Sequence, residues 1–358
     1  MKPVTLYDVA DYAGVSYQTV SRVVNGASHV SSRTREKVNA AMSALNYIPN
    51  RVAQQLAGKN APLIGVVTTT LALHAPSQIV AAIKSRADHA AASVVISMVE
   101  HSGVAACNAA VRSLMAQRVT GIIINYPLDE PAAAEVATAC DTVPVLFLDV
   151  PQQAAVNHIV FCHDDGARLG VEQLIQHGHR HIALLSGPHH AVASRLRLVG
   201  WHHALAQHGI TPSIEMAGDW SAMSGFLQTQ QMLNNGTVPT AMLIANDQMA
   251  LGAMRAISES GRRVAADISV IGYDDTDDSA CFTPPLTTIR QDFRLLGENS
   301  VDQILALSRG EQASVRQVLP VALVSRKTVL PPAAQGGSPQ VLADALMQLA
   351  QQVAQLAN

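Results

Sequence analysis

Short, almost wholly apolar segments alternate with helical stretches from residue 63 onward, and this alternation constrains the fold more than any other feature. Strands that are apolar along their whole length are buried on both faces, as in parallel sheets covered by helices. Residues 60–330 are too many for one such sheet, so we expect an α/β core of two doubly wound parallel-sheet subdomains. The predicted strands are Leu63–Val67, Val94–Val99, Gly121–Ile124, Val145–Leu148, Ile182–Leu185, Met242–Ala245 and Ile268–Gly272.

Polar residues follow four of these strands, where ligands of open α/β sheets bind. Each one alone is more often a turn residue or a helix cap. Together with an arginine, a glutamine and two aromatic residues they offer what a sugar needs, because carboxylates, amides and a guanidinium bind hydroxyls and an indole covers an apolar ring face. The residues are Asn125, Asp149, Asn246 and Asp274, with Arg197, Trp220, Gln291 and Phe293.

The first 25 residues predict two short helices joined by a tight turn. Thr5 is followed by Asp8 in a capping pattern, and Gly14 supplies a sharp exit from the first helix. Ser16 then caps a second helix, Tyr17 to about Asn25. The apolar face consists of Leu6, Val9, Ala10, Ala13, Val20, Val23 and Val24. The second helix leaves outward side chains that can reach base edges in DNA, namely Tyr17, Gln18, Ser21 and Arg22.

Charge favours a DNA-binding unit over an ordinary amphipathic helix pair. Residues 1–59 carry seven Lys or Arg against three Asp or Glu, whereas residues 60–358 carry 17 against 24. A basic excess confined to one end is typical of nucleic-acid binding. A third helix, capped by Ser31 or Ser32, completes a small core with Val38, Ala41, Met42 and Leu45.

The N-terminal motifs resemble those of the lactose/galactose repressor family of bacterial transcription regulators. The matching segments are Leu6–Ala10, Gly14–Ser16, Thr19–Val23 and Asn25, with Tyr17, Gln18 and Arg22, and the resemblance continues from Met1 to Asn358. It implies a helix-turn-helix headpiece (1–49), a hinge helix (50–59), a periplasmic-binding-protein-like core (60–330), a linker (331–339) and a tetramerisation helix (340–358). The chain would cross between the core subdomains near Cys162, Gln291 and Val321.

The resemblance also implies which residues contact operator DNA. Those in the headpiece are Leu6, Ser16, Tyr17, Gln18, Thr19, Ser21, Arg22, Asn25, His29, Ser31 and Thr34, and those in the hinge are Asn50, Ala53, Leu56 and Ala57. The residues alone favour a simple linker at 50–58, since so short a helix is marginal in water. The resemblance favours a hinge helix with Leu56 as an apolar wedge for the minor groove.

The inducer pocket implied by the resemblance includes the polar residues above and several apolar ones. Ala193 stands where the family has a serine, which removes a hydroxyl contact from the expected site. The expected ligand-binding residues are Leu73, Ala75, Pro76, Ile79, Asn125, Leu148, Asp149, Phe161, Ala193, Arg197, Trp220, Asn246, Gln248, Asp274, Gln291, Phe293 and Leu296.

The C-terminal segment has a heptad pattern behind a Pro- and Gly-rich linker. Its apolar residues are Leu342, Leu346, Leu349, Val353 and Leu356. Such a helix either docks on its own core or assembles with other copies. The resemblance implies that it joins two homodimers into a homotetramer.

Signs of catalysis, cofactors or a membrane span are missing from the sequence. It contains no Gly-rich phosphate loop, no Gly-x-Ser-x-Gly elbow and no apolar run long enough for a membrane. The clusters His177–His181, His189–His190 and His202–His203 lack a companion carboxylate or thiol and are expected at surface turns rather than at a metal. Four widely spaced cysteines are interpreted as buried thiols, and no signal peptide precedes the headpiece, so we expect a cytoplasmic protein.

These observations predict a non-enzymatic repressor of a lactose-type operon. It would bind double-stranded operator DNA and be released by a small-molecule galactoside inducer in the core cleft. The alternatives are a family member that senses a purine or another co-repressor, and a cytoplasmic sugar-binding protein with an acquired headpiece.

Overall fold

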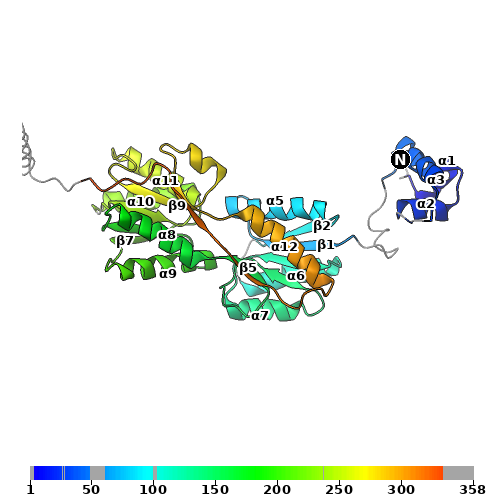
Figure 1. Ribbon diagram of the computed structural model, residues 1–358, viewed down its shortest axis with the longest axis horizontal. Coiled ribbons are helices and arrows are strands. Elements are labelled where there is room, and N and C mark those ends of the chain that lie inside the picture. Colours follow the sequence, from blue (N-terminus) through cyan, green and yellow to red (C-terminus); the bar gives the residue numbers. More distant parts are fainter. Residues whose placement is uncertain are drawn as a thin grey trace, which may run out of the picture. The chain divides into compact units, whose positions relative to one another are not determined.

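The computed structural model describes residues 4–25, 27, 29–48, 61–99, 103–236 and 238–333. The chain forms two compact units, residues 1–63 and 64–358, which are described separately (Figure 1). The predicted hinge helix (50–59), most of the predicted linker and the predicted tetramerisation helix (340–358) lie outside the described residues.

The first unit holds the predicted helix-turn-helix: α1 (Leu6–Ala13), α2 (Tyr17–Val24) and α3 (Ser32–Ala44). Thr5 and Asp8 form the capping box of α1, and Gly14 ends it with a left-handed φ of 63°. Ser16 and Ser31 cap the next two helices through the N–H groups of Thr19 and Thr34. The second helix ends at Val24, one residue before the predicted Asn25, which is its C-cap. Small apolar side chains fill the core between the helices: Val9, Ala10, Ala13, Val20, Val23, Val38 and Ala41.

The second unit contains two parallel sheets. The first has the strand order β11-β5-β4-β3-β1-β2. Two helix pairs accompany it. One pair is α5 (His74–His89) with α12 (Phe293–Ser308), and the other is α6 (Val104–Ala116) with α7 (Glu130–Ala139). Its strands are β1 (Leu63–Thr68), β2 (Ser93–Met98), β3 (Gly121–Asn125), β4 (Val145–Phe147), β5 (His158–Phe161) and β11 (Arg316–Leu319).

The second sheet has the order β12-β10-β9-β8-β6-β7. One helix pair, α8 (His163–Gln176) with α9 (Val192–Gln207), and another, α10 (Ala222–Asn234) with α11 (Asp247–Glu259), cover its two faces (Figure 1). Its strands are β6 (Ile182–Ser186), β7 (Ile214–Ala217), β8 (Ala241–Ile244), β9 (Ser269–Asp274), β10 (Thr287–Arg290) and β12 (Ala322–Val324), and a 3-10 helix, η1 (Asp277–Cys281), lies between β9 and β10.

The two-sheet expectation is confirmed, with two corrections. The edge strand β12 runs antiparallel to β10, so the second sheet is not wholly parallel. Among the described residues, five strands were not predicted: β5, β7, β10, β11 and β12. They are short, and polar residues such as His158, Glu215 and Gln317 interrupt the apolar pattern that identifies a buried strand.

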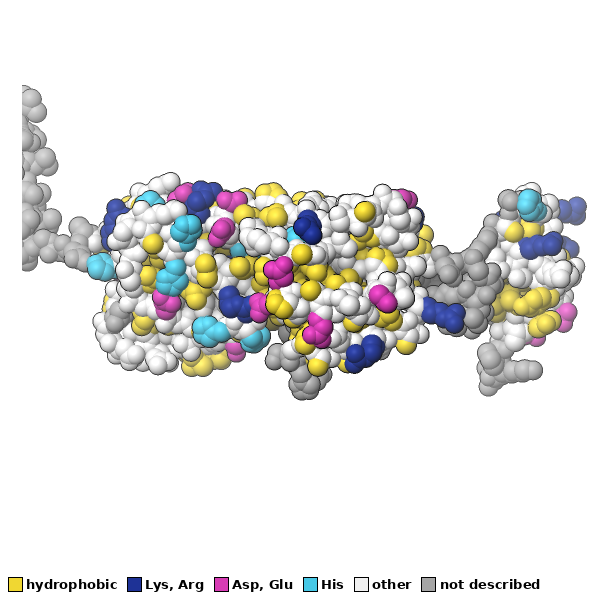
Figure 2. Space-filling model, turned by 90° about the horizontal axis from the view of Figure 1, so that it is seen from below, with side chains coloured by type: hydrophobic (Ala, Val, Ile, Leu, Met, Phe, Trp, Pro, Cys, Tyr) yellow, Lys and Arg dark blue, Asp and Glu magenta, His cyan; other side chains and the backbone are white. Residues whose placement is uncertain are grey.

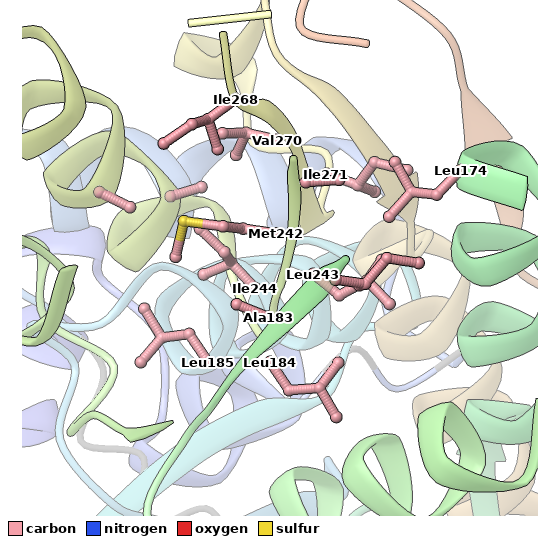
Figure 3. Close-up of a cluster of buried hydrophobic side chains, with 14 of the residues drawn as sticks. Leu174, Ala183, Leu184, Leu185, Met242, Leu243, Ile244, Ile268, Val270 and Ile271 are labelled. Atoms are coloured by element: carbon pink, nitrogen blue, oxygen red, sulfur yellow. The ribbon is translucent and has the colours of Figure 1, made fainter. Parts of the chain in front are cut away.

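The strands bury the cores that the apolar pattern predicts. In the subdomain that holds the second sheet, side chains of β6, β8 and β9 form one buried cluster, with Leu174 of α8 beside Ile271 (Figure 3). Gly166 lets α8 approach this sheet, because a Cβ there would lie 2.1 Å from the hydroxyl oxygen of Tyr273. Close packing at this position fixes the start of α8 beside the end of β9.

Three connections join the two subdomains. The chain passes from β5 to α8 at Cys162, from β10 to α12 at Gln291, and from β11 to β12 near Val321, as predicted. Within the described residues, no helix combines the length and apolar character needed to span a membrane.

Candidate functional site

A cleft of about 940 Å³ lies in the second unit, at the carboxyl ends of strands from both sheets. Every predicted ligand-binding residue, from Leu73 to Leu296, lines this cleft. The structure therefore brings together residues that are distant in the sequence and that parallel strands direct to one edge, including Asn125 at the end of β3 and Asp274 at the end of β9. That they bind a ligand stays a prediction.

Arg197 is the centre of the polar wall and is 5% exposed. Its Nη2 donates to Oε1 of Gln291 at 2.8 Å, and Nη1 donates to the main-chain oxygen of Ala245. The guanidinium carbon lies 3.8 Å from the centre of the Tyr273 ring and 5.7 Å from that of Trp220. These contacts hold the guanidinium in one orientation, as recognition of paired hydroxyls requires.

Two carboxyl groups of the cleft have raised pKa values. Burial raises the pKa of Asp149 to about 6, against the lowering effects of the Arg197 guanidinium and the main-chain N–H of Ala193. Burial likewise raises the pKa of Asp274 to about 7, although Arg197 lowers it. Both groups gain proton affinity because the protein gives the charged form less solvation than water does.

Asp274 has spare hydrogen-bonding capacity. Its Oδ1 accepts no hydrogen bond from the described residues, and Nη2 of Arg197 is 3.6 Å away. A buried acceptor without a donor is costly unless a ligand or water satisfies it. This carboxylate is therefore suited to accept a hydrogen bond from a ligand hydroxyl.

Two other predicted residues use their side chains within the protein. Asn246 caps α11 through the N–H of Met249, and its Nδ2 donates to the main-chain oxygen of Trp220 at 3.0 Å. Oε1 of Gln248 accepts from the N–H of His74 at 3.3 Å, a contact between the two subdomains. Both residues line the cleft, and their bonds hold its shape.

The opposite wall is mostly apolar. Phe161 and Phe293 meet edge to face, with ring centres 5.9 Å apart, beside Ile79 and Leu296. The start of α5 and the first residues of α12 add Ala75, Pro76 and Phe293 to this surface. Such a wall matches the apolar face of a sugar ring or an apolar substituent.

Sequence reasoning missed several cleft residues, above all His163. Its Nδ1 accepts from Nε of Arg197 at 3.5 Å, and burial with the Arg197 charge lowers the pKa of His163 to about 3, so the ring is neutral. His163 follows β5, and it would have stood out as a polar strand-end residue if β5 had been recognised. Asp129, His190, Arg195 and Asp219 also line the cleft and had no signal of their own.

The headpiece presents a second candidate site on α2. Tyr17, Gln18 and Arg22 are exposed, whereas Val20 and Val23 are buried, as the helical period predicts. The Tyr17 ring stacks on that of Tyr7, with centres 4.6 Å apart, and sequence reasoning did not single out Tyr7. The predicted DNA contacts at Asn50, Ala53, Leu56 and Ala57 lie outside the described residues.

Two expectations about histidine and cysteine need correction. His179 is fully buried rather than at a surface turn, because its ring bonds Oγ1 of Thr240 and the main-chain oxygen of Leu330. Cys107 and Cys140 are buried as predicted, but Cys162 is only partly buried and Cys281 is exposed. On the face in Figure 2 the histidines are spread out, and the described residues include no cluster of three metal-ligating side chains.

Comparison with known proteins assigns both units. Residues 5–50 match the family model "Bacterial regulatory proteins, lacI family", and residues 171–329 match "Periplasmic binding protein-like domain". The lactose operon repressor of Escherichia coli (strain K12) is 69% identical over 356 residues, which are 99% of each chain. The chain belongs to the lacI family of bacterial regulatory proteins. Family membership agrees with the predicted headpiece and core.

Other lacI-family proteins extend the comparison. The lactose operon repressor of Klebsiella pneumoniae is 43% identical over 339 residues, covering 95% of this chain and 96% of its own. A crystal structure of the lac repressor dimer bound to operator and the anti-inducer ONPF superimposes with a TM-score of 0.87 at 70% identity, over 92% of this chain and all of the other. The lacI-family chain is a transcriptional repressor and not an enzyme.

Proposed function

We propose that this lacI-family protein represses a lactose-type operon, binding operator DNA through the headpiece and releasing it when a galactoside enters the cleft. The cleft carries the proposal, because a buried guanidinium, a carboxylate oxygen that accepts no hydrogen bond from the described residues and an apolar wall together suit a sugar. The end-to-end similarity to a lactose operon repressor supports the same function.

Release follows from the way the cleft is built. Its two walls come from different subdomains, so a ligand that contacts both favours the subdomain arrangement in which both can reach it. Operator binding would favour another arrangement of the core next to the headpiece. The two ligands then oppose each other by equal factors, as linkage requires.

Base recognition belongs to the exposed start of α2. Tyr17, Gln18 and Arg22 are exposed on this helix, while Arg33 and Lys37, exposed on α3, would contact phosphates. Exchanging Tyr17 and Gln18 would change which bases the protein prefers, and selection from randomised half-sites measures the preferred sequence. Recovery of the same half-site by the exchanged protein would contradict this role.

Assembly is proposed from the sequence pattern and the relatives. A dimer would place two headpieces on a two-fold operator, with residues 50–59 reaching the minor groove and the heptad at 340–358 joining dimers into a tetramer. A chain ended after Leu330 would then sediment as a dimer that keeps operator and sugar binding. A tetramer from that chain would exclude the tail as the assembly element.

One titration tests the function as a whole. The full chain is bound to a lactose-type operator fragment, and galactosides, glucosides and purines are added in turn while the bound fraction is measured. We expect release by a galactoside and no strengthening by purines. Tighter operator binding with a purine would favour the co-repressor alternative, and no operator binding at all would contradict the repressor function.

A further inference from the structure

Two consecutive carboxylates at the end of β9 have opposite surroundings. Asp274 faces the cleft with an oxygen that accepts no hydrogen bond from the described residues. Asp275 does not line the cleft, and both of its carboxylate oxygens accept hydrogen bonds within the protein. Its Oδ2 accepts from Nε of Arg290 and its Oδ1 from Nη2 of Arg326, both at 2.6 Å. Its side chain is only 6% exposed, and although burial raises the pKa of Asp275, the two arginines hold it below its ordinary value.

The backbone at this point has an unusual conformation. The φ angles are 115° at Asp274 and 58° at Asp275, in the region that non-glycine residues rarely adopt. Such a conformation persists only where neighbouring contacts hold it. Asp275 supplies these contacts on one side, and Asp247 supplies another by accepting from the N–H of Thr276 at 2.9 Å.

The arginines that hold Asp275 lie next to the connections between the subdomains. Arg290 ends β10 and directly precedes Gln291, where the second connection begins. Arg326 follows β12, just after the third connection, and also donates to the main-chain oxygen of Leu286 at 2.8 Å. One buried carboxylate thus joins the cleft-facing turn to two arginines that lie near two of the connections between the subdomains.

We propose that Asp275 is a positioning residue for the inducer: its bonds to Arg290 and Arg326 hold the strained turn that points Asp274 into the cleft. Asp275 does not line the cleft, so it acts through Asp274. The proposal rests on the proposed galactoside function and adds a residue outside the cleft wall. Through these hydrogen bonds, the turn that carries Asp274 is also connected to residues near the inter-subdomain connections.

The test compares Asp275→Asn with Asp267→Asn in the full chain. Asp267 is the matched control, because it also accepts from an arginine, Arg263, at 2.7 Å, but lies away from the cleft. Calorimetry with a β-galactoside should show binding weakened by about tenfold or more in Asp275→Asn only. Operator binding without sugar should stay at the wild-type level in both variants.

Amide hydrogen exchange without sugar provides a second measurement. Loss of the Asp275 bonds should speed exchange at the N–H groups of Thr276 and Gln291, which bond Asp247 and the main-chain oxygen of Asp274. Exchange at these amides should be unchanged in Asp267→Asn. The exchange measurement needs no ligand, so it tests the positioning role of Asp275 even if the sugar is not a galactoside.

The outcomes separate the two proposals. A wild-type chain that binds no galactoside contradicts the proposed function, and the exchange result alone then decides the role of Asp275. Wild-type sugar affinity and unchanged exchange in Asp275→Asn would overturn the positioning role. If Asp275→Asn does not fold, Arg290→Gln is compared by the same two measurements. Arg290 is half-exposed, and its replacement removes one of the two arginine bonds to Asp275.

Discussion

The two walls of the cleft differ in what they offer a ligand, although each comes from a sheet wound in the same way. The first subdomain contributes mainly apolar side chains, with Ile79, Phe161 and Leu296 among them. The second contributes Arg197, which bonds Gln291 at 2.8 Å and the neutral His163 at 3.5 Å and lies over the Tyr273 ring. It also contributes Asp274, whose Oδ1 is 3.6 Å from Nη2 of Arg197. The first wall therefore responds mainly to the shape of a ligand, although Asn125 and Asp149 add polar groups to it, and the second responds to the direction of hydrogen bonds.

This division determines how selectivity arises. Any ring that covers an apolar wall gains roughly the same binding free energy, because hydrophobic burial has no direction. A wall of buried polar groups penalises a sugar that leaves one of them unpaired. Affinity should depend on both walls, whereas discrimination between epimers should depend mainly on the polar groups of the second subdomain, together with Asn125 and Asp149 of the first.

The largest effect is expected from Arg197→Lys, which breaks the polar wall at its centre. Lysine keeps the charge but cannot reproduce the two-pronged geometry or the stacking on Tyr273. Galactoside binding should lose about 2 kcal/mol or more, while operator binding without sugar stays near normal. Calorimetry beside operator binding measures both, and full sugar affinity would mean that the cleft is not the sugar site.

The pH dependence tests the polar wall without mutation. The pKa of Asp274 is raised to about 7, so this group is protonated below that pH and ionised above it. Sugar hydroxyls donate to the ionised form and stabilise it, so binding releases a proton and affinity should rise as the pH increases through about 7. The gain should approach about tenfold per pH unit below that value.

Asp274→Asn is the control for this pH dependence. An amide does not titrate, so the profile of the variant should be flatter, with only the contribution of Asp149, whose pKa is raised to about 6. A slope that persists unchanged between pH 6 and pH 8 would assign the dependence to another group.

A smaller effect is expected when the apolar wall is reduced by Ile79→Val. One buried methylene is worth about 0.8 kcal/mol, or roughly fourfold in affinity. The loss should be equal for a galactoside and the corresponding glucoside, because the apolar contact does not read hydroxyl orientation. Competition titrations with both sugars measure the two factors, and unequal losses would show that this wall also discriminates epimers.

The smallest effect is expected from Ala193→Ser, which adds a hydroxyl to the polar wall. Ala193 lines the cleft, and its main-chain N–H already lowers the pKa of Asp149. A neutral hydrogen bond at the low end of the usual range contributes about 0.5 kcal/mol, so galactoside affinity should increase about twofold. Weaker binding, measured by calorimetry, would show that the pocket is shaped for alanine.

Much of this architecture is determined by local sequence patterns. The capping pair Thr5 and Asp8, the turn at Gly14 and the period of Val20 and Val23 specify the headpiece, because each rests on contacts within a few residues. The apolar strands predict two layered sheets for the same reason. Resemblance to a family, rather than pattern, supplied apolar cleft residues such as Leu73 and Leu296.

Only the tertiary structure decides how the polar groups are used. Gln248 bonds His74 of the other subdomain while Asp274 keeps an oxygen that accepts no hydrogen bond from the described residues, and nothing in their sequence positions distinguishes these cases. His163 and Asp275 gain their surroundings from Arg197 and from Arg326, which are distant in the chain. Hydrogen bonds and pKa values depend on neighbours brought together by folding, whereas helix caps and strand periodicity depend on neighbours along the chain. For this reason the sequence alone determined the headpiece helices and the wholly apolar strands, and the tertiary structure decided where the shorter strands pair and which carboxylate is left for the ligand.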